Sequence, residues 1–268
     1  MTGGAQRVRL AAVAGAFYPR SPQALRDALT AAFADAKAPP PGAPVPKALV
    51  VPHAGYVYSG AVAATAYLRL APARDRITRV VLLGPNHRVP LAGMAVSSAD
   101  AFATPFGPVT VDDEARRLAL ALPGVAVDDD AHALEHSLEV QLPFLQTVLD
   151  GAAVLPVVVG QCPTADVVAL LDALWGGPET VVVVSTDLSH YHRYADAVAL
   201  DRRTVAAVAA LEPEGVGDHD ACGAYPLRGL LATARRRGLA ADVLDVRNSG
   251  DTAGDRERVV GYGAVAVG

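Results

Sequence analysis

Four short runs of valine and leucine constrain the fold of this chain more than any other feature. They cover residues 48–51, 80–83, 154–159 and 181–184. Each run is apolar at nearly every position instead of alternating between apolar and polar residues. A strand needs such a run when both faces of its sheet are covered. The runs therefore predict a central, largely parallel sheet packed between helices.

Segments with helical periodicity separate these strands, which is typical of the α/β class. Ser21-Pro22 is a helix-start signal for a first helix that reaches about Ala36, and the proline-rich residues 39–46 form a linker. The close pair of short strands at 93–97 and 108–111 predicts a hairpin. The sequence thus predicts an α/β fold, a single domain over residues 1–268 with a central mixed, largely parallel sheet flanked by helices. Further strands are expected at 124–127, 242–248 and 259–267, and further helices at 59–70, 112–122, 137–149, 164–174, 195–211 and 227–237.

Composition excludes several classes of protein. The chain is 51% hydrophobic and 19% charged with a net charge of −5, which describes a globular protein with an ample core. It has no cluster of basic residues that would indicate nucleic-acid binding. No apolar run is long enough for a membrane span, and no secretory signal is recognised. Two cysteines in 268 residues suit a reducing compartment, so we expect a cytoplasmic protein.

Histidines follow two of the predicted central strands at the point where each strand ends. His53 lies in Pro52-His53-Ala54-Gly55-Tyr56, and His87 lies in Gly84-Pro85-Asn86-His87. The carboxyl ends of parallel strands meet at one crevice, where ligands bind in open α/β sheets. Neutral imidazole is the commonest protein ligand for metals. The two histidines therefore predict a metal site, although each alone could be an ordinary surface residue.

Cys222 is a candidate for a third metal ligand. It precedes a glycine and a predicted helix start, and a thiolate at a helix N-terminus is expected to have a depressed pKa. Two alternatives remain open: Cys222 could be a buried structural thiol, or it could form a disulfide with Cys162.

Three further residues are candidates for proton handling. Asp187 and His190 follow the strand that ends near Ser185, where an aspartate with a histidine can orient ligands or transfer protons. An Asx-turn would explain Asp187 equally well. His136 lies with Glu135 at an expected helix entrance, where helix capping is the alternative. Residues 132–136 spell the inverted zinc-protease motif, which we discount because the helix is expected to begin near position 136.

The chain resembles the Memo family, whose bacterial and archaeal members are called AmmeMemoRadiSam system protein B. The resemblance spans nearly the whole chain and rests on segments 14–19, 52–60, 83–87, 104–107, 135–145, 185–190, 222–223 and 260–263. The family is similar in fold to the class III extradiol dioxygenases, which are non-haem iron enzymes. The resemblance therefore implies a fold like that of the dioxygenase catalytic subunit. It also implies a metal pocket at His53, His87 and Cys222, with Asp187 and His190 nearby.

A thiolate stands where the dioxygenases have a carboxylate ligand, and this departure puts ring cleavage in doubt. The leading hypothesis is a cytoplasmic metal-binding protein of this family, with a metal-dependent oxidoreductase as its candidate activity. Fe(II) is the first candidate metal, and Cu or Zn are alternatives. The metal pocket would bind a small molecule or a peptide. His136, His190 and Asp187 would transfer protons to or from that molecule or orient the metal ligands. The rival hypothesis is a non-catalytic metal- or peptide-binding module that acts with a radical-SAM partner. A metal-free hydrolase with Cys222 as nucleophile is a third reading.

Overall fold

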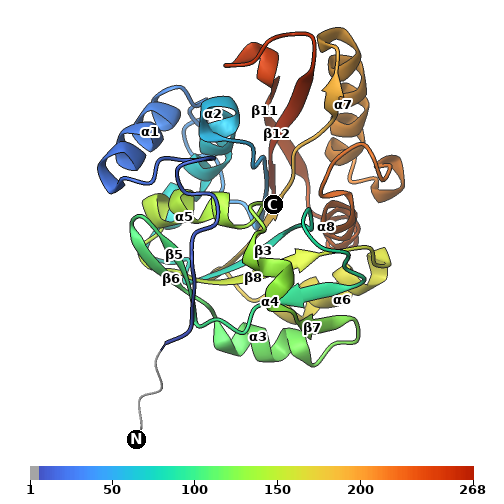
Figure 1. The fold of residues 1–268 in the computed structure, drawn as a ribbon. Coiled ribbons are helices and arrows are strands. Elements are labelled where there is room, and N and C mark those ends of the chain that lie inside the picture. Colours follow the sequence, from blue (N-terminus) through green and yellow to red (C-terminus); the bar gives the residue numbers. More distant parts are fainter. Residues whose placement is uncertain (1–5) are drawn as a thin grey trace, which may run out of the picture.

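The central sheet of the protein is mixed, and its four middle strands are parallel. A computed structural model describes residues 6–268 (Figure 1). The sheet order is β10-β12-β2-β9-β3-β8-β4-β7, with β11 paired to β12 outside that path. The prediction of an α/β fold with a mixed central sheet is confirmed, and the parallel pairing is concentrated in the middle, between β2, β9, β3 and β8. The main-sheet strands are β2 (Ala48–Val51), β3 (Arg79–Pro85), β4 (Met94–Val96), β7 (Val125–Val127), β8 (Ala153–Val159), β9 (Thr180–Ser185), β10 (His190–His192), β11 (Ala241–Asn248) and β12 (Val259–Val267).

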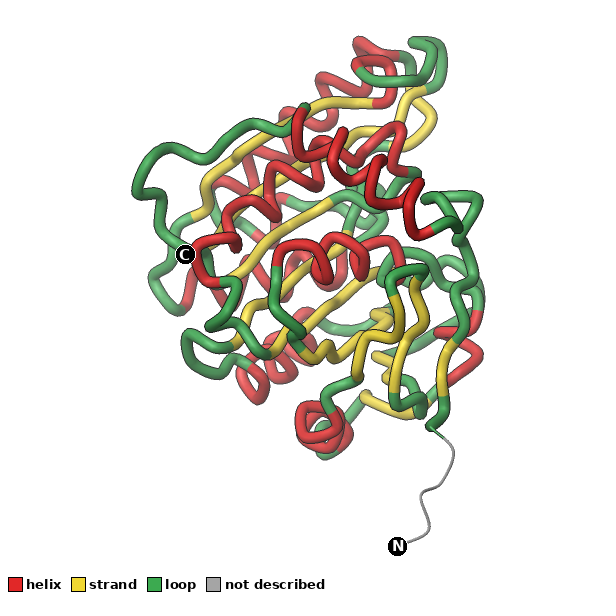
Figure 2. The backbone as a smooth tube through the Cα atoms, turned by 90° about the vertical axis from the view of Figure 1, so that its left-hand side faces the viewer, coloured by secondary structure: helices red, strands yellow, loops and turns green. Residues whose placement is uncertain are grey.

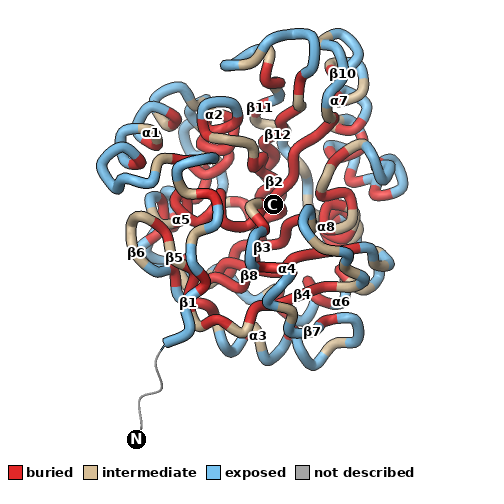
Figure 3. The backbone as a smooth tube through the Cα atoms, viewed as in Figure 1, coloured by how far each residue is buried: buried red, intermediate tan, exposed pale blue. Residues whose placement is uncertain are grey.

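Helices cover both faces of this sheet, as Figure 2 shows. Consecutive valines of β9 point to opposite faces: Val181 and Val183 join one hydrophobic core, while Val182 and Val184 join the other. Because each face of the sheet packs against its own hydrophobic core, the central strands are apolar at consecutive positions and lie buried (Figure 3). The helices are α1 (Pro22–Ala34), α2 (Tyr56–Tyr67), α3 (Asp113–Leu120), α4 (Asp129–Ala133), α5 (Leu142–Val148), α6 (Thr164–Leu174), α7 (Tyr194–Ala209) and α8 (Ala224–Arg236).

Local signals explain where some helices begin and how they pack. The Ser21 side chain accepts a hydrogen bond from the Ala24 backbone N–H, and Pro22 occupies the first turn of α1, as predicted. Gly229 lets α8 approach α6, because an added Cβ would overlap the side chain of Val167. Short 3₁₀ segments lie at Leu68–Ala73, Glu139–Gln141, Pro213–Gly215 and Ser249–Asp251.

Two predicted elements are wrong. The expected hairpin of residues 93–97 and 108–111 does not form: β4 instead joins the main sheet antiparallel to β8. The hairpin consists of β5 (Ala101–Thr104), which was not predicted, and β6 (Gly107–Thr110), with β1 (Val8–Arg9) completing a small separate sheet. The helix expected over 137–149 begins as a 3₁₀ turn at Glu139 and becomes α-helical only at Leu142.

No helix within residues 6–268 is both long enough and apolar enough to cross a membrane.

Candidate metal centre

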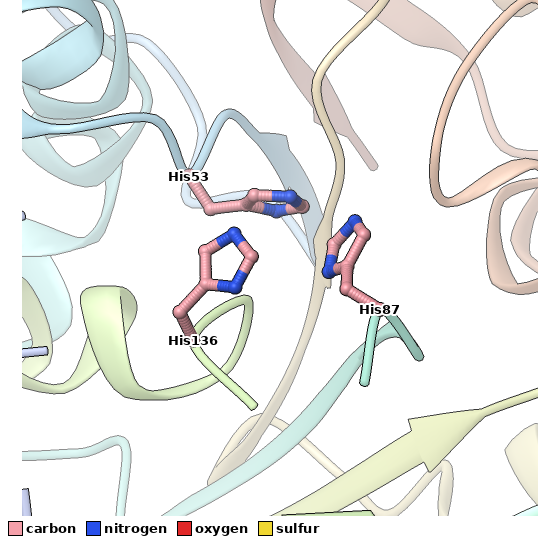
Figure 4. A group of neighbouring side chains, drawn as sticks. All are labelled: His53, His87 and His136. Carbon is pink, nitrogen blue, oxygen red and sulfur yellow. The ribbon is translucent and has the colours of Figure 1, made fainter. Parts of the chain in front are cut away.

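Three histidines from separate segments converge beyond the carboxyl ends of the central strands (Figure 4). His53 follows β2, His87 follows β3, and His136 lies in the loop between α4 and the 3₁₀ turn at Glu139. One ring nitrogen of each lies within 4.8 Å of those of the other two. His53 is buried, whereas 27% of the His87 side chain is exposed, so solvent reaches the group from the His87 side.

Hydrogen bonds determine which nitrogen of His53 faces the site. Its Nδ1 lies 2.8 Å from Ser185 Oγ. The Ser185 hydroxyl already donates its proton to the Ser137 carbonyl at 2.7 Å, so it accepts from His53 Nδ1–H. Gln141 Nε2 donates to the same Oγ and so anchors it. Nε2 of His53 therefore carries the free lone pair that a metal requires.

Glu135 orients His87 in the same way. A carboxylate only accepts hydrogen bonds, so His87 Nδ1, which lies 2.9 Å from Glu135 Oε1, is the donor, and Nε2 is free. Burial of Glu135 opposes its ionisation, but His87 and the backbone N–H groups of His87 and Ser137 outweigh burial and lower the Glu135 pKa to about 2. A carboxylate that holds a ligating histidine is a common feature of metal sites.

His136 completes the group. Its Nδ1 is buried and has no hydrogen-bond partner among residues 6–268, although Glu135 Oε1 lies 3.3 Å away. Phe17 packs against its ring at 4.6 Å between centroids. Burial lowers the pKa of His136 to about 4, so the imidazole is neutral at pH 7. His136, which the sequence analysis assigned to proton handling, thus lies among the three potential metal donors.

Cys222 lies at the edge of this group, just before α8. Its Sγ lies 3.4 Å from His53 Nε2 and 3.6 Å from the Asp187 carbonyl, so the one thiol proton can be donated to either acceptor. Sγ also accepts the Asp187 backbone N–H at 3.2 Å. Burial raises the pKa of Cys222 to about 12, so the expectation of a depressed pKa is wrong for the metal-free protein. Cys162 and Cys222 are both free thiols, and the disulfide alternative is also wrong.

Asp187 and His190 lie near the histidines of the group. Asp187 Oδ1 accepts the His53 backbone N–H at 2.8 Å, and burial raises the pKa of Asp187 to about 7. His190 Nδ1 donates to the Leu188 carbonyl at 2.8 Å, which leaves its Nε2 unprotonated. Burial lowers the pKa of His190.

His132, the first histidine of the discounted protease motif, lies elsewhere. Its ring is buried on α4, where Nε2 donates to the Ala95 carbonyl at 3.0 Å and the ring packs edge-on against Phe102. It is thus separated from His136.

The three histidines fit a metal ion. Burial, reinforced by His87 and His136, lowers the pKa of His53 well below its usual range, so it too is neutral and able to ligate. His53 and His87 each present Nε2 because a neighbour holds Nδ1, and His136 has a buried nitrogen without a partner. Sequence reasoning assigned no role to Ser185 and Gln141. Both fall in segments that carry the family resemblance, which was the only signal for them.

Replacing Ser185 with alanine is expected to lower metal affinity by about 10–100-fold, because His53 loses the acceptor that holds its Nδ1 proton. Metal dissociation constants measured by competition with a chromogenic chelator would show the change. Ser189→Ala is the matched control, since the Ser189 hydroxyl is buried but has no hydrogen-bond partner among the described residues. Equal affinities in the two variants would contradict the role assigned to Ser185.

Comparison with known proteins identifies the family of this chain and agrees with its fold. The family model described as Memo-like protein matches residues 9–266. MEMO1 family proteins of Ignicoccus hospitalis and Aquifex aeolicus are 38% and 37% identical to this chain. The matches cover 96% of this chain in both cases, and 98% and 97% of the respective relatives.

A solved structure shows the same fold at greater distance. An uncharacterized protein of Escherichia coli K12 superposes with a TM-score of 0.53 at 14% sequence identity, over 80% of this chain and 98% of that one. The likeness extends to the fold alone, whereas the family match and the curated relatives span nearly the full length. The chain belongs to the Memo family.

Proposed function

We propose that this protein is a metal-dependent oxidoreductase whose metal is held by His53, His87 and a third donor, His136 or Cys222. The observation that supports it most is the convergence of three imidazoles within 4.8 Å, two of them with Nδ1 already engaged. A bound Fe(II) would supply activation of dioxygen, and a copper or zinc ion is the alternative for this donor set. A structural zinc site would be closed by four ligands and would need no further titratable groups.

Asp187 and His190 are the surplus groups that favour catalysis over a structural role. His190 presents an unprotonated Nε2, so it can accept a proton from a substrate hydroxyl or amine. Asp187, with a pKa of about 7, can exchange a proton near neutral pH. It also holds the His53 backbone in place. His190 can thus receive a proton from a substrate, and Asp187 positions His53 as a metal ligand.

The test is oxygen uptake by full-length protein reconstituted with Fe(II) under anaerobic conditions and then given dioxygen with catechol or a substituted catechol. We expect uptake that needs both metal and diol. His190→Asn should keep its iron and lose at least about tenfold in turnover, because only the proton acceptor is removed. Iron uptake without turnover on any diol would overturn the dioxygenase chemistry, and no metal uptake would overturn the whole proposal.

A second candidate function is a binding module for a peptide, or for a radical-SAM partner protein, in a reducing cytoplasm. It is favoured by two exposed side chains at the start of α2, next to His53: Val57 is 71% and Tyr58 is 38% exposed. A partner that covers them would bury apolar surface beside the metal centre. Two free thiols suit a reducing compartment.

A further inference from the structure

A cavity of about 640 Å³ lies next to the metal centre, on the side of Cys222. It is formed beyond the ends of β3 and β8 and at the start of α8, with Cys222 and Asn86 in its wall. Its volume is that of a pocket for a small organic molecule. Two larger cavities, of about 880 Å³ between α1, α5 and the β5–β6 hairpin and of about 760 Å³ between α1 and the start of α2, are lined by none of the candidate metal or proton-handling residues. Of these three cavities, the Cys222 cavity is the one with a candidate metal ligand in its wall.

The wall of the Cys222 cavity carries no charged side chain. It consists of prolines, glycine and aliphatic residues, together with Asn86, Gln161, Cys222 and Tyr225. The Arg228 guanidinium lies over the Tyr225 ring of this wall and is paired with Asp218. A charged ligand in this cavity would lose part of its hydration without gaining an ion pair with a lining side chain, so binding of a charged ligand is disfavoured.

Two polar groups of the wall remain available for a ligand. The Asn86 side chain is occupied, since its amide donates to the Val89 carbonyl and its oxygen accepts backbone N–H groups of Arg88 and Val89. The side-chain amide of Gln161 and the hydroxyl of Tyr225 make no hydrogen bond to any residue between 6 and 268. They offer both donors and acceptors to an uncharged polar molecule.

We infer that the Cys222 cavity is the substrate chamber of the metal centre and that it takes an uncharged small molecule with hydrogen-bonding groups, such as a neutral phenol. The inference rests on the proposed metal-dependent function. It adds the side from which the substrate approaches and the charge class of that substrate. Cys222 is the wall shared by the chamber and the histidines, because its Sγ lies 3.4 Å from His53 Nε2.

The test is the labelling rate of Cys222 with three methanethiosulfonates of similar size: neutral, anionic and cationic. The assay uses full-length Cys162→Ser protein, in which Cys222 is the only thiol, after treatment with a chelator to remove metal. Each labelling rate is divided by the rate of the same reagent with free cysteine. We expect the neutral reagent to react at least about tenfold faster than either charged one. Phenol at millimolar concentration should slow labelling, and benzoate at the same concentration should not.

Introducing a charge at Gln161 shows whether reagent selectivity comes from the cavity or only from burial of the Cys222 thiol. Gln161→Lys should raise the relative rate of the anionic reagent and Gln161→Glu that of the cationic one, because residue 161 lines the cavity. The same two changes at exposed Gln23 on α1 should leave all rates unaltered. The inference would be overturned by equal rates for the three reagents, by no labelling of Cys222, or by labelling rates that do not change in the Gln161 variants. Because the assay contains no metal, its result is separate from that of iron uptake.

Discussion

Alanine at His53 or His87 is expected to abolish stoichiometric metal binding. Each change removes one of three donors whose nitrogens lie within 4.8 Å. Loss of a residue that merely orients a ligand costs about 10–100-fold in affinity, so loss of a ligand itself should cost at least about 100-fold. The measurement is metal content by elemental analysis after anaerobic purification, followed by titration of the chelated protein with Fe(II). Full occupancy in both variants would contradict the site.

The same experiment decides the third ligand. If Cys222 is a ligand, Cys222→Ser should lose metal as completely as His53→Ala. If His136 is the ligand, His136→Ala should lose metal and Cys222→Ser should keep it. His219→Ala is the control, since His219 is exposed in a turn three residues before Cys222 and is not among the three clustered histidines. A metal would also have to displace the Cys222 proton, whose pKa of about 12 makes thiolate ligation costly unless the cation compensates.

The central sheet and the position of two histidines could be predicted because they depend on local sequence. Continuous valine runs form doubly covered strands, and the carboxyl ends of parallel strands lie at one edge of the sheet. His53 and His87 follow such strands directly. Their convergence can therefore be predicted without knowing the conformations of the loops.

Long-range pairing explains what could not be predicted. Glu135 orients His87 across 48 positions of sequence, and Ser185 orients His53 across 132. Neither spacing follows a helix or strand period, so no local pattern points to the pair. His136 reaches the group from a loop that follows no strand. The strand β5 is four residues long, and its partner β1 has two, so neither carries a recognisable alternation.

The N-terminal segment is held over the metal centre by Glu139, whose side chain is fully buried. Its carboxylate pairs with the Arg9 guanidinium and accepts the Val13 backbone N–H at 3.0 Å and the Tyr18 hydroxyl at 2.6 Å. Tyr18 directly follows Phe17, which packs on His136. Glu139 therefore links the start of the chain to the wall of the site.

Replacing Glu139 with alanine is expected to lower the free energy of unfolding by about 3–5 kcal/mol, because the buried Arg9 charge and the donors from Val13 and Tyr18 lose their acceptor. Urea denaturation measures the loss. Asp150→Asn is the matched control: it breaks the Arg74–Asp150 pair, in which both side chains are more than half exposed, and should cost less than about 1 kcal/mol. Trypsin should also cleave Glu139→Ala faster at Arg9 and Arg20, because the segment between them is no longer anchored. A loss no larger than that of the control would mean that the N-terminal segment is held by its apolar contacts instead.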